Sequence, residues 1–234
     1  MLLIATLLAS GARAEIVEEL VVTARKVDEQ LQDVSASLQV LSGDFLDTAD
    51  LSRLYELQYA VPGLVVNNVG MFGARFALRG VTDEGGSSLA IANHLNGAYL
   101  GSGNLAIARS FDMERVEVLK GPQGTLYGRN ATGGSINFVT RPAEHEFDAG
   151  FESAYGSFDT TRLQGHLNVP FAVGAARLAF IGSEGDGYID NSLDGREFGE
   201  ADFWGLRGSV ALDPTEDLHL DFYGATRGRR WRGG

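Results

Sequence analysis

Residues 115–120 and 135–138 alternate between apolar and polar side chains. Val116 and Val118 occupy one face of the first segment. A period of two predicts a β-strand with one buried face and one solvated face, so both segments are expected to be half-buried strands. Glycine, proline and asparagine are frequent in the 14 residues between them, and these residue types accept turn geometries. The connection is therefore predicted to be a compact, ordered loop.

Short elements are predicted in the region before these strands. Ser42 and Asp50 are candidate helix N-caps. The spacing of apolar residues over 51–61 predicts a helix that must end before Pro62. Asn96 and Gly97 form a hairpin-turn signal. Further strands are predicted over residues 34–40, 64–66, 76–78, 89–92 and 98–100. Together these elements predict one α+β domain over residues 28–142.

The pattern changes after Pro142, where five segments of about ten residues or fewer alternate with one apolar face. These segments are 147–155, 161–169, 176–180, 206–213 and 218–222. The connections 170–175 and 213–217 are short, whereas 185–202 is long and polar. This arrangement is typical of antiparallel transmembrane β-barrel strands, which we predict over residues 147–234. A soluble sandwich also alternates, so periodicity alone leaves that alternative open.

The first 27 residues predict two segments that lie outside the folded domains. Residues 1–14 are largely apolar and end in Ala12-Arg13-Ala14, which is a signal-peptide cleavage pattern. Residues 15–27 contain a short β-prone run between charged residues. On these residues alone, the second segment is interpreted as an edge strand or a tail.

The composition narrows the possible functions. A net charge of −12 argues against a nucleic-acid-binding surface. The chain has no cysteine, which excludes disulfides and thiolate chemistry. Its 31 glycines and only 5 prolines favour many turns and closely packed strands over a helical bundle.

The glycine-rich connection 121–134 suggests one enzymatic alternative, a nucleotide site. A Walker loop requires G-x-x-x-x-G-K-[ST] followed by a helix, whereas Arg129 and Asn130 follow Gly128 and a strand comes next. The 4 histidines lack the spacing of a metal site, and no Ser-His-Asp arrangement stands out. We therefore predict a protein that is not an enzyme, with no catalytic residue, no metal and no cofactor.

One stretch resembles a known family. Residues 115–142 read RVEVLKGPQGTLYGRNATGGSINFVTRP, which resembles the end of the plug domain of TonB-dependent outer-membrane receptors. Three further matches occur in the order that the family has them. Glu19 to Ala24 resembles the TonB box, Val61 to Leu64 the early plug, and Leu78 to Val81 its middle. The resemblance runs from about Glu15 to the end of the sequence.

The resemblance implies a receptor in the bacterial outer membrane that takes up a scarce nutrient, with a ferric siderophore expected first. Its partners would be membrane lipid, that small ligand and the periplasmic domain of TonB, to which the TonB box adds as a β-strand. The implied box residues are Leu20, Val21, Val22, Thr23 and Ala24.

Two further sets of residues follow from the resemblance. Residues in three loops of the plug are expected to face the ligand: Asn68, Phe72, Arg75, Gly86, Ser87, Tyr99 and Asn104. Charged residues of the plug are expected to form ion pairs with the barrel: Arg79, Arg115, Glu117, Lys120, Arg129 and Arg141.

The number of predicted barrel strands is small for this family. Plugged transporters have about 22 strands, and five cannot close such a wall. The sequence is therefore expected to be an N-terminal, truncated part of a receptor that does not transport alone. A secreted β-rich binding module or adhesin remains the alternative, since it explains the alternation and the glycine content but not the ordered motifs.

Overall fold

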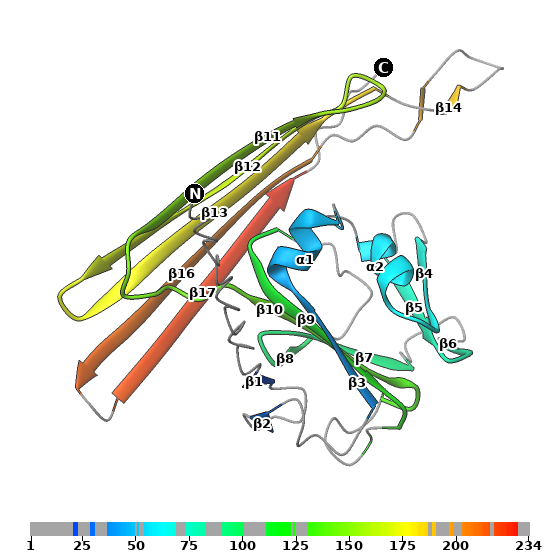
Figure 1. Ribbon diagram of the computed structural model, residues 1–234, viewed down its shortest axis with the longest axis horizontal. Helices are drawn as coiled ribbons and strands as arrows, with labels where there is room; N and C mark the ends of the chain where they lie inside the picture. The colour runs from blue at the N-terminus through cyan, green and yellow to red at the C-terminus, as the bar shows by residue number, and fades with distance from the viewer. Residues whose placement is uncertain are drawn as a thin grey trace, which may run out of the picture.

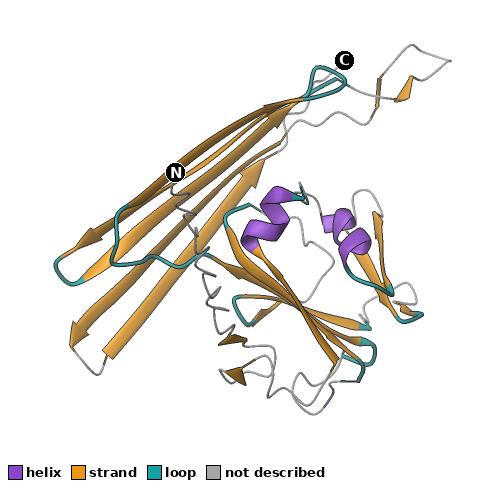
Figure 2. Cartoon of the chain, viewed as in Figure 1, coloured by secondary structure: helices purple, strands orange, loops and turns teal. Residues whose placement is uncertain are grey.

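The chain forms two parts, an N-terminal domain of short strands and helices (residues 37–141) and a C-terminal sheet of long strands (residues 148–228), which lie side by side (Figures 1 and 2). The computed structural model describes residues 21–22, 29–30, 37–49, 51, 54–68, 74–82, 90–100, 111–122, 124, 131–186, 189–190, 197–198, 203–215 and 218–228. The predicted signal segment and the N-cap Asp50 lie outside the described residues.

A five-stranded sheet organises the N-terminal domain, in the order β3-β9-β10-β7-β8. Its central strands are β9 (Met113–Lys120) and β10 (Gly134–Thr140), which pair antiparallel as the two segments predicted from alternation. β10 also pairs parallel with β7 (Ile91–Leu95), while β3 (Ser37–Ser42) and β8 (Ala98–Tyr99) form the edges. Long-range pairing therefore places the last two strands of the domain, β9 and β10, inside the sheet and leaves β3 and β8 at its edges.

The helices and a second, three-stranded sheet cover the first sheet. Helix α1 (Gly43–Thr48) begins at Ser42, whose Oγ accepts a hydrogen bond from the Phe45 N–H, as predicted for an N-cap. A 3₁₀ turn (Leu54–Glu56) leads into α2 (Leu57–Ala60), and this helix ends before Pro62 as expected. The second sheet contains β4 (Leu64–Asn68), β5 (Ala74–Leu78) and β6 (Val81–Thr82). No helix in the described part of the chain is long and apolar enough to cross a membrane.

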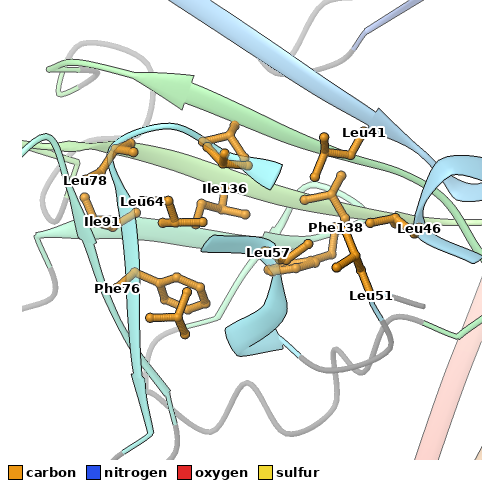
Figure 3. Close-up of a cluster of buried hydrophobic side chains, with 14 of the residues drawn as sticks. Leu41, Leu46, Leu51, Leu57, Leu64, Phe76, Leu78, Ile91, Ile136 and Phe138 are labelled. Atoms are coloured by element: carbon orange, nitrogen blue, oxygen red, sulfur yellow. The ribbon is translucent and has the colours of Figure 1, made fainter. Parts of the chain in front are cut away.

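Apolar side chains from both sheets and the helices meet in one core (Figure 3). Leu46 from α1 and Leu57 from α2 lie near Phe138 of β10, and Phe76 and Ile136 belong to the same cluster. These side chains are almost entirely buried, which gives the N-terminal domain a hydrophobic core of its own.

The polar face of β9 and β10 is buried as well, so the expectation of half-buried strands was wrong. Arg115 and Glu117 on β9 and Ser135 and Asn137 on β10 are all less than a tenth exposed. Arg115 Nε donates to Glu117 Oε1 at 2.7 Å, and Asn137 Nδ2 donates to Glu117 Oε2 at 3.3 Å. These hydrogen bonds offset the cost of burying the charges.

The C-terminal sheet contains five antiparallel strands in sequence order, β11-β12-β13-β16-β17. They are β11 (Asp148–Tyr155), β12 (Thr161–Phe171), β13 (Gly174–Glu184), β16 (Phe203–Thr215) and β17 (Leu218–Gly228). The long connection between β13 and β16 contains a small hairpin of β14 (Ile189–Asp190) and β15 (Glu197–Phe198). All five strands predicted after Pro142 are thus present, and most extend beyond the predicted ends.

The two faces of the C-terminal sheet differ in polarity. One face, here called the outer face, carries exposed apolar side chains on every strand, including Phe151, Leu167, Leu178, Leu206 and Phe222. The inner face looks toward the N-terminal domain and carries the polar alternates. A soluble sandwich would bury the apolar face, so this arrangement has the polarity of a membrane barrel wall.

Candidate functional site

The N-terminal domain touches the inner face of the C-terminal sheet through the dipeptide that precedes β9. Asp112 has a φ of +51°, a left-handed conformation that Asp tolerates better than most residues. Its carboxylate accepts hydrogen bonds from Arg177 of β13, at 3.1 Å from Nε to each oxygen and 2.5 Å from Nη2 to Oδ1. Both side chains are about 95 % buried, so this ion pair is desolvated.

A second arginine holds the same dipeptide from the neighbouring strand. Arg207 of β16 donates from Nη1 to the carbonyl oxygens of Phe111 at 2.7 Å and of Asp112 at 3.3 Å. Its guanidinium also lies 4.4 Å from the centre of the Phe111 ring, within the range of a cation–π contact. Phe111 in turn packs with Ala179, Ile181 and Phe203 of the sheet. We call Phe111, Asp112, Arg177 and Arg207 the interdomain contact.

A polar cavity of about 350 Å³ lies beside the interdomain contact, between the two parts of the chain. Asp47 and Arg141 line it from the N-terminal domain, and Asp148, Glu152 and His166 line it from the C-terminal sheet. Partial burial raises the pKa of Asp47, and the nearby Arg141 charge opposes that rise. The lining contains four carboxylates, including that of Asp112, and one arginine, so acidic groups predominate around the cavity.

The charged residues expected to form ion pairs with the barrel make contacts inside the N-terminal domain. Arg115 pairs with Glu114 and Glu117. Arg141 Nη2 donates to Asp44 Oδ1 at 2.8 Å. The Arg115 pairs lie within β9, whereas the Arg141 contact joins the end of the domain to helix α1.

Arg79 and Lys120, from the same set, lie near the edge strand β3. Arg79 Nη2 donates to Ser37 Oγ at 2.9 Å, and Lys120 Nζ donates to Gln39 Oε1 at 2.9 Å. Burial, followed by the charge of Arg79, lowers the pKa of Lys120. Arg129 lies outside the described residues.

The residues expected to face a ligand are only partly covered by the structure. Asn68 ends β4, Arg75 is a half-buried residue of β5, and Tyr99 is an exposed residue of β8. The Tyr99 ring packs edge-on against His94, with the ring centres 5.7 Å apart. Phe72, Gly86, Ser87 and Asn104 lie outside the described residues.

The expected TonB box is described only at Val21 and Val22, and Leu20, Thr23 and Ala24 lie outside the described residues. These two valines form β1 (Val21–Val22), which pairs antiparallel with β2 (Glu29–Gln30). Val21 and Val22 therefore have an extended backbone, the conformation needed for strand addition.

The sequence did not single out the residues of the interdomain contact. Asp112 lies just before the predicted strand 115–120, and Arg177 and Arg207 lie within the predicted strands 176–180 and 206–213. The available signal was the presence of two arginines on lumen-facing positions of neighbouring predicted strands, where an uncompensated charge needs a partner. In the described part of the chain, no group of three or more His, Asp or Glu side chains is arranged to hold a metal ion.

Comparison with known proteins identifies the family of the N-terminal domain. The family model described as the TonB-dependent receptor plug domain matches residues 30–135. The pesticin receptor of Yersinia pestis is 31 % identical over 196 residues, which cover 82 % of this chain and 28 % of the receptor. The vitamin B12 transporter BtuB of Vibrio vulnificus is 28 % identical over 182 residues, covering 75 % of this chain and 29 % of the transporter.

Solved structures resemble both parts of the chain. The ferric yersiniabactin uptake receptor FyuA from Yersinia pestis superposes with a TM-score of 0.75 at 26 % identity, covering 82 % of this chain and 31 % of that receptor. The pyoverdine outer membrane receptor FpvA from Pseudomonas aeruginosa shares the fold, with a TM-score of 0.73 at 20 % identity over 88 % of this chain and 29 % of that receptor. The chain thus spans less than a third of the length of the curated relatives named above.

Proposed function

The N-terminal domain of this chain is a plug domain of the TonB-dependent outer-membrane receptor family, and from this premise we propose that the chain takes part in TonB-energised uptake of a scarce nutrient. Membership of this family places the chain in the outer membrane of Gram-negative bacteria. We assign residues 15–27 to the TonB box segment, 28–142 to the plug and 147–234 to strands of the barrel wall.

The observation that carries this proposal is the opposite polarity of the two faces of the C-terminal sheet. Its inner face binds the plug through the buried Asp112–Arg177 pair, and its outer face exposes Leu178 and Phe222. Lipid solvates such an outer face, whereas a secreted binding module would place it in water. A barrel wall that binds a plug on its inner face and contacts lipid on its outer face is the arrangement expected of a gated transporter.

Energy coupling is assigned to residues 20–24. Strand addition to the sheet of TonB uses main-chain hydrogen bonds, so it needs an extended segment and tolerates varied side chains. The extended backbone of Val21 and Val22 supports this assignment. A pull on this segment acts on the plug, whose charged contacts with Arg177 and Arg207 resist its displacement.

The first test measures binding of the purified periplasmic domain of TonB to the full chain in detergent micelles. Val22→Pro removes a backbone donor from the box and is expected to abolish binding. Val17→Pro, five residues upstream in the same segment, is the matched control and should bind as the wild type does. Equal binding by all three proteins, or by none, contradicts the coupling assignment.

The ligand class is the finer part of the proposal, and we propose a ferric siderophore. The relatives named above include receptors for pesticin, ferric yersiniabactin and pyoverdine, together with a vitamin B12 transporter. The candidate ligand-side residues are Asn68, Phe72, Arg75, Gly86, Ser87, Tyr99 and Asn104.

Titration of the chain with ferric yersiniabactin, ferric pyoverdine and vitamin B12 tests this class, with tryptophan fluorescence as the readout. Quenching by a ferric siderophore alone is the expected result, and Tyr99→Ala should weaken it. Quenching by vitamin B12 alone would contradict the siderophore assignment and leave the assignment to nutrient uptake unchanged.

A further inference from the structure

The short connection between the plug and β11 contacts the plug at Arg141 and the C-terminal sheet from Ala143 onward. Arg141 still belongs to the plug, because its N–H donates to the Asp112 carbonyl at 3.1 Å and its Nε to the Met113 carbonyl at 3.2 Å. Ala143, in contrast, is buried in a cluster with Ala175 of β13 and Ala211 of β16. Pro142 lies between these two environments.

Asn168 of β12 binds the backbone of this connection. Its Nδ2 donates to the Glu144 carbonyl at 2.7 Å and to the Glu146 carbonyl at 2.5 Å. Its Oδ1 accepts from the Glu144 N–H at 3.1 Å. The side chain is fully buried, so these three hydrogen bonds replace water that the amide would otherwise bind.

Two further contacts fix the same segment to the C-terminal sheet. His145 Nε2 lies 2.6 Å from Asp213 Oδ2 at the end of β16, although this exposed pair adds little stability by itself. The small side chains of Ala143, Ala175 and Ala211 allow the backbone to approach the sheet closely. Three strands, β12, β13 and β16, therefore contribute to holding a stretch of five residues.

We propose that residues 143–147 form a fixed anchor on the barrel wall, positioned by Asn168, and that the plug moves relative to this anchor. Force applied at residues 20–24 would break the interdomain contact while the other end of the plug stays attached. The motion rests on the proposed function, but the anchor itself can be measured without TonB or a ligand.

The test is amide hydrogen exchange of the full chain in detergent micelles at increasing urea concentration. If the anchor belongs mechanically to the wall, the Glu144 amide stays protected at urea concentrations where the amides of Val116 and Ile136 in the plug have exchanged. Exchange of Glu144 in step with the plug strands would overturn the proposal. This comparison uses the wild-type chain and needs no variant to fold.

Substitution of Asn168 then tests its positioning role. Asn168→Leu should raise the exchange rate of the Glu144 amide about ten-fold or more and open the segment to a protease that cleaves after glutamate. Asn168→Asp retains the acceptor for the Glu144 N–H but loses both donations, so an intermediate rate is expected. Gln164→Leu changes a polar residue on the same face of β12 and is the matched control. Unchanged protection in Asn168→Leu would remove Asn168 from the anchor.

The two assignments fail in different ways. Loss of TonB binding in Val22→Pro with unprotected Glu144 would leave the coupling intact and discard the anchor. Protected Glu144 without any TonB binding would leave the anchor intact and discard the coupling.

Discussion

The strands of the plug and of the C-terminal sheet share the same alternation of apolar and polar residues. The plug buries both faces of its central strands, whereas the C-terminal sheet exposes its apolar face. In β9 the apolar Val116 and the charged Glu117 are both buried. In β13 the apolar Leu178 is 47 % exposed, whereas the neighbouring Arg177 is only 6 % exposed. Alternation therefore fixes which residues share a face, and the surroundings of the strand decide which face meets solvent or lipid.

The difference follows from the number of layers in each part. The plug packs an apolar core between two sheets and helices, and it buries a second, polar face that is satisfied by hydrogen bonds such as Asn137 to Glu117. The C-terminal sheet is a single layer whose apolar side chains face outward and whose arginines face the plug. Substitutions in the plug core, on the outer face of the sheet and at the interdomain contact should test this difference between the two parts.

The largest effect is expected in the plug core. Phe138 is fully buried, so Phe138→Ala should lower the free energy of unfolding of the plug by about 3–5 kcal/mol. Phe222→Ala on the outer face of β17 should leave that value unchanged, because the residue belongs to the other part of the chain. Urea titration followed by exchange of the β9 and β10 amides measures both. Similar losses from the two variants would show that the parts unfold as one unit.

A somewhat smaller effect is expected when a charge enters the outer face. Leu178→Arg should destabilise the sheet in lipid vesicles by about 2–4 kcal/mol if the residue lies near the bilayer midplane. Gln164→Arg places the same side chain on the inner face, where polar groups are already present, and should be tolerated. Folding in vesicles can be followed by the fluorescence of Trp204 in β16. Equal tolerance of both arginines argues against lipid at the outer face.

The smallest of the three effects concerns the boundary between the two regimes. Asp112→Asn keeps the size and the tolerance of positive φ but removes the charge that Arg177 binds. Because Asp148 remains 3.3 Å from Arg177 Nη1 and still offsets the charge of the arginine, the expected cost to plug binding is about 1–3 kcal/mol. Asp148→Asn removes the other, more exposed carboxylate near Arg177 and should cost less. Plug release in urea, read from amide exchange of Met113, ranks the two. A larger loss from Asp148→Asn would show that Arg177 is held mainly by the carboxylate of the C-terminal sheet and not by Asp112 of the plug.

Much of the fold follows from the sequence, whereas the contacts between its parts do not. The N-cap at Ser42, the helix stop before Pro62, the Asn96-Gly97 turn and the five long strands all rest on local chemistry, and the structure confirms them. The burial of Glu117 depends on neighbours from β10, and these are remote in sequence. The pairing of Asp112 with Arg177 joins residues 65 positions apart, for which no local pattern exists.

The site was predicted unevenly for the same reason. The assignment of Val21 and Val22 to a TonB box rests on the resemblance of a short linear motif, and it stays a prediction. Arg141 was expected to pair with the barrel, but its described partners are Asp44 and the Met113 carbonyl. Charge type alone indicates that a partner is needed and does not indicate which one, since geometry makes that choice.

The strand order of the plug has a consequence for the order in which the protein can fold. β3 pairs with β9, some 75 residues later, and β7 pairs with β10 across about 40 residues, so both edges of the sheet depend on the last two strands of the plug. The C-terminal sheet, in contrast, is assembled from neighbouring hairpins with local contacts. A chain leaving its export channel N-terminus first therefore cannot complete the plug until about residue 140 has emerged. The segment from β3 to β8 therefore stays without its partner strands for the longest time. We expect a periplasmic chaperone that prevents premature collapse of the plug to bind this segment.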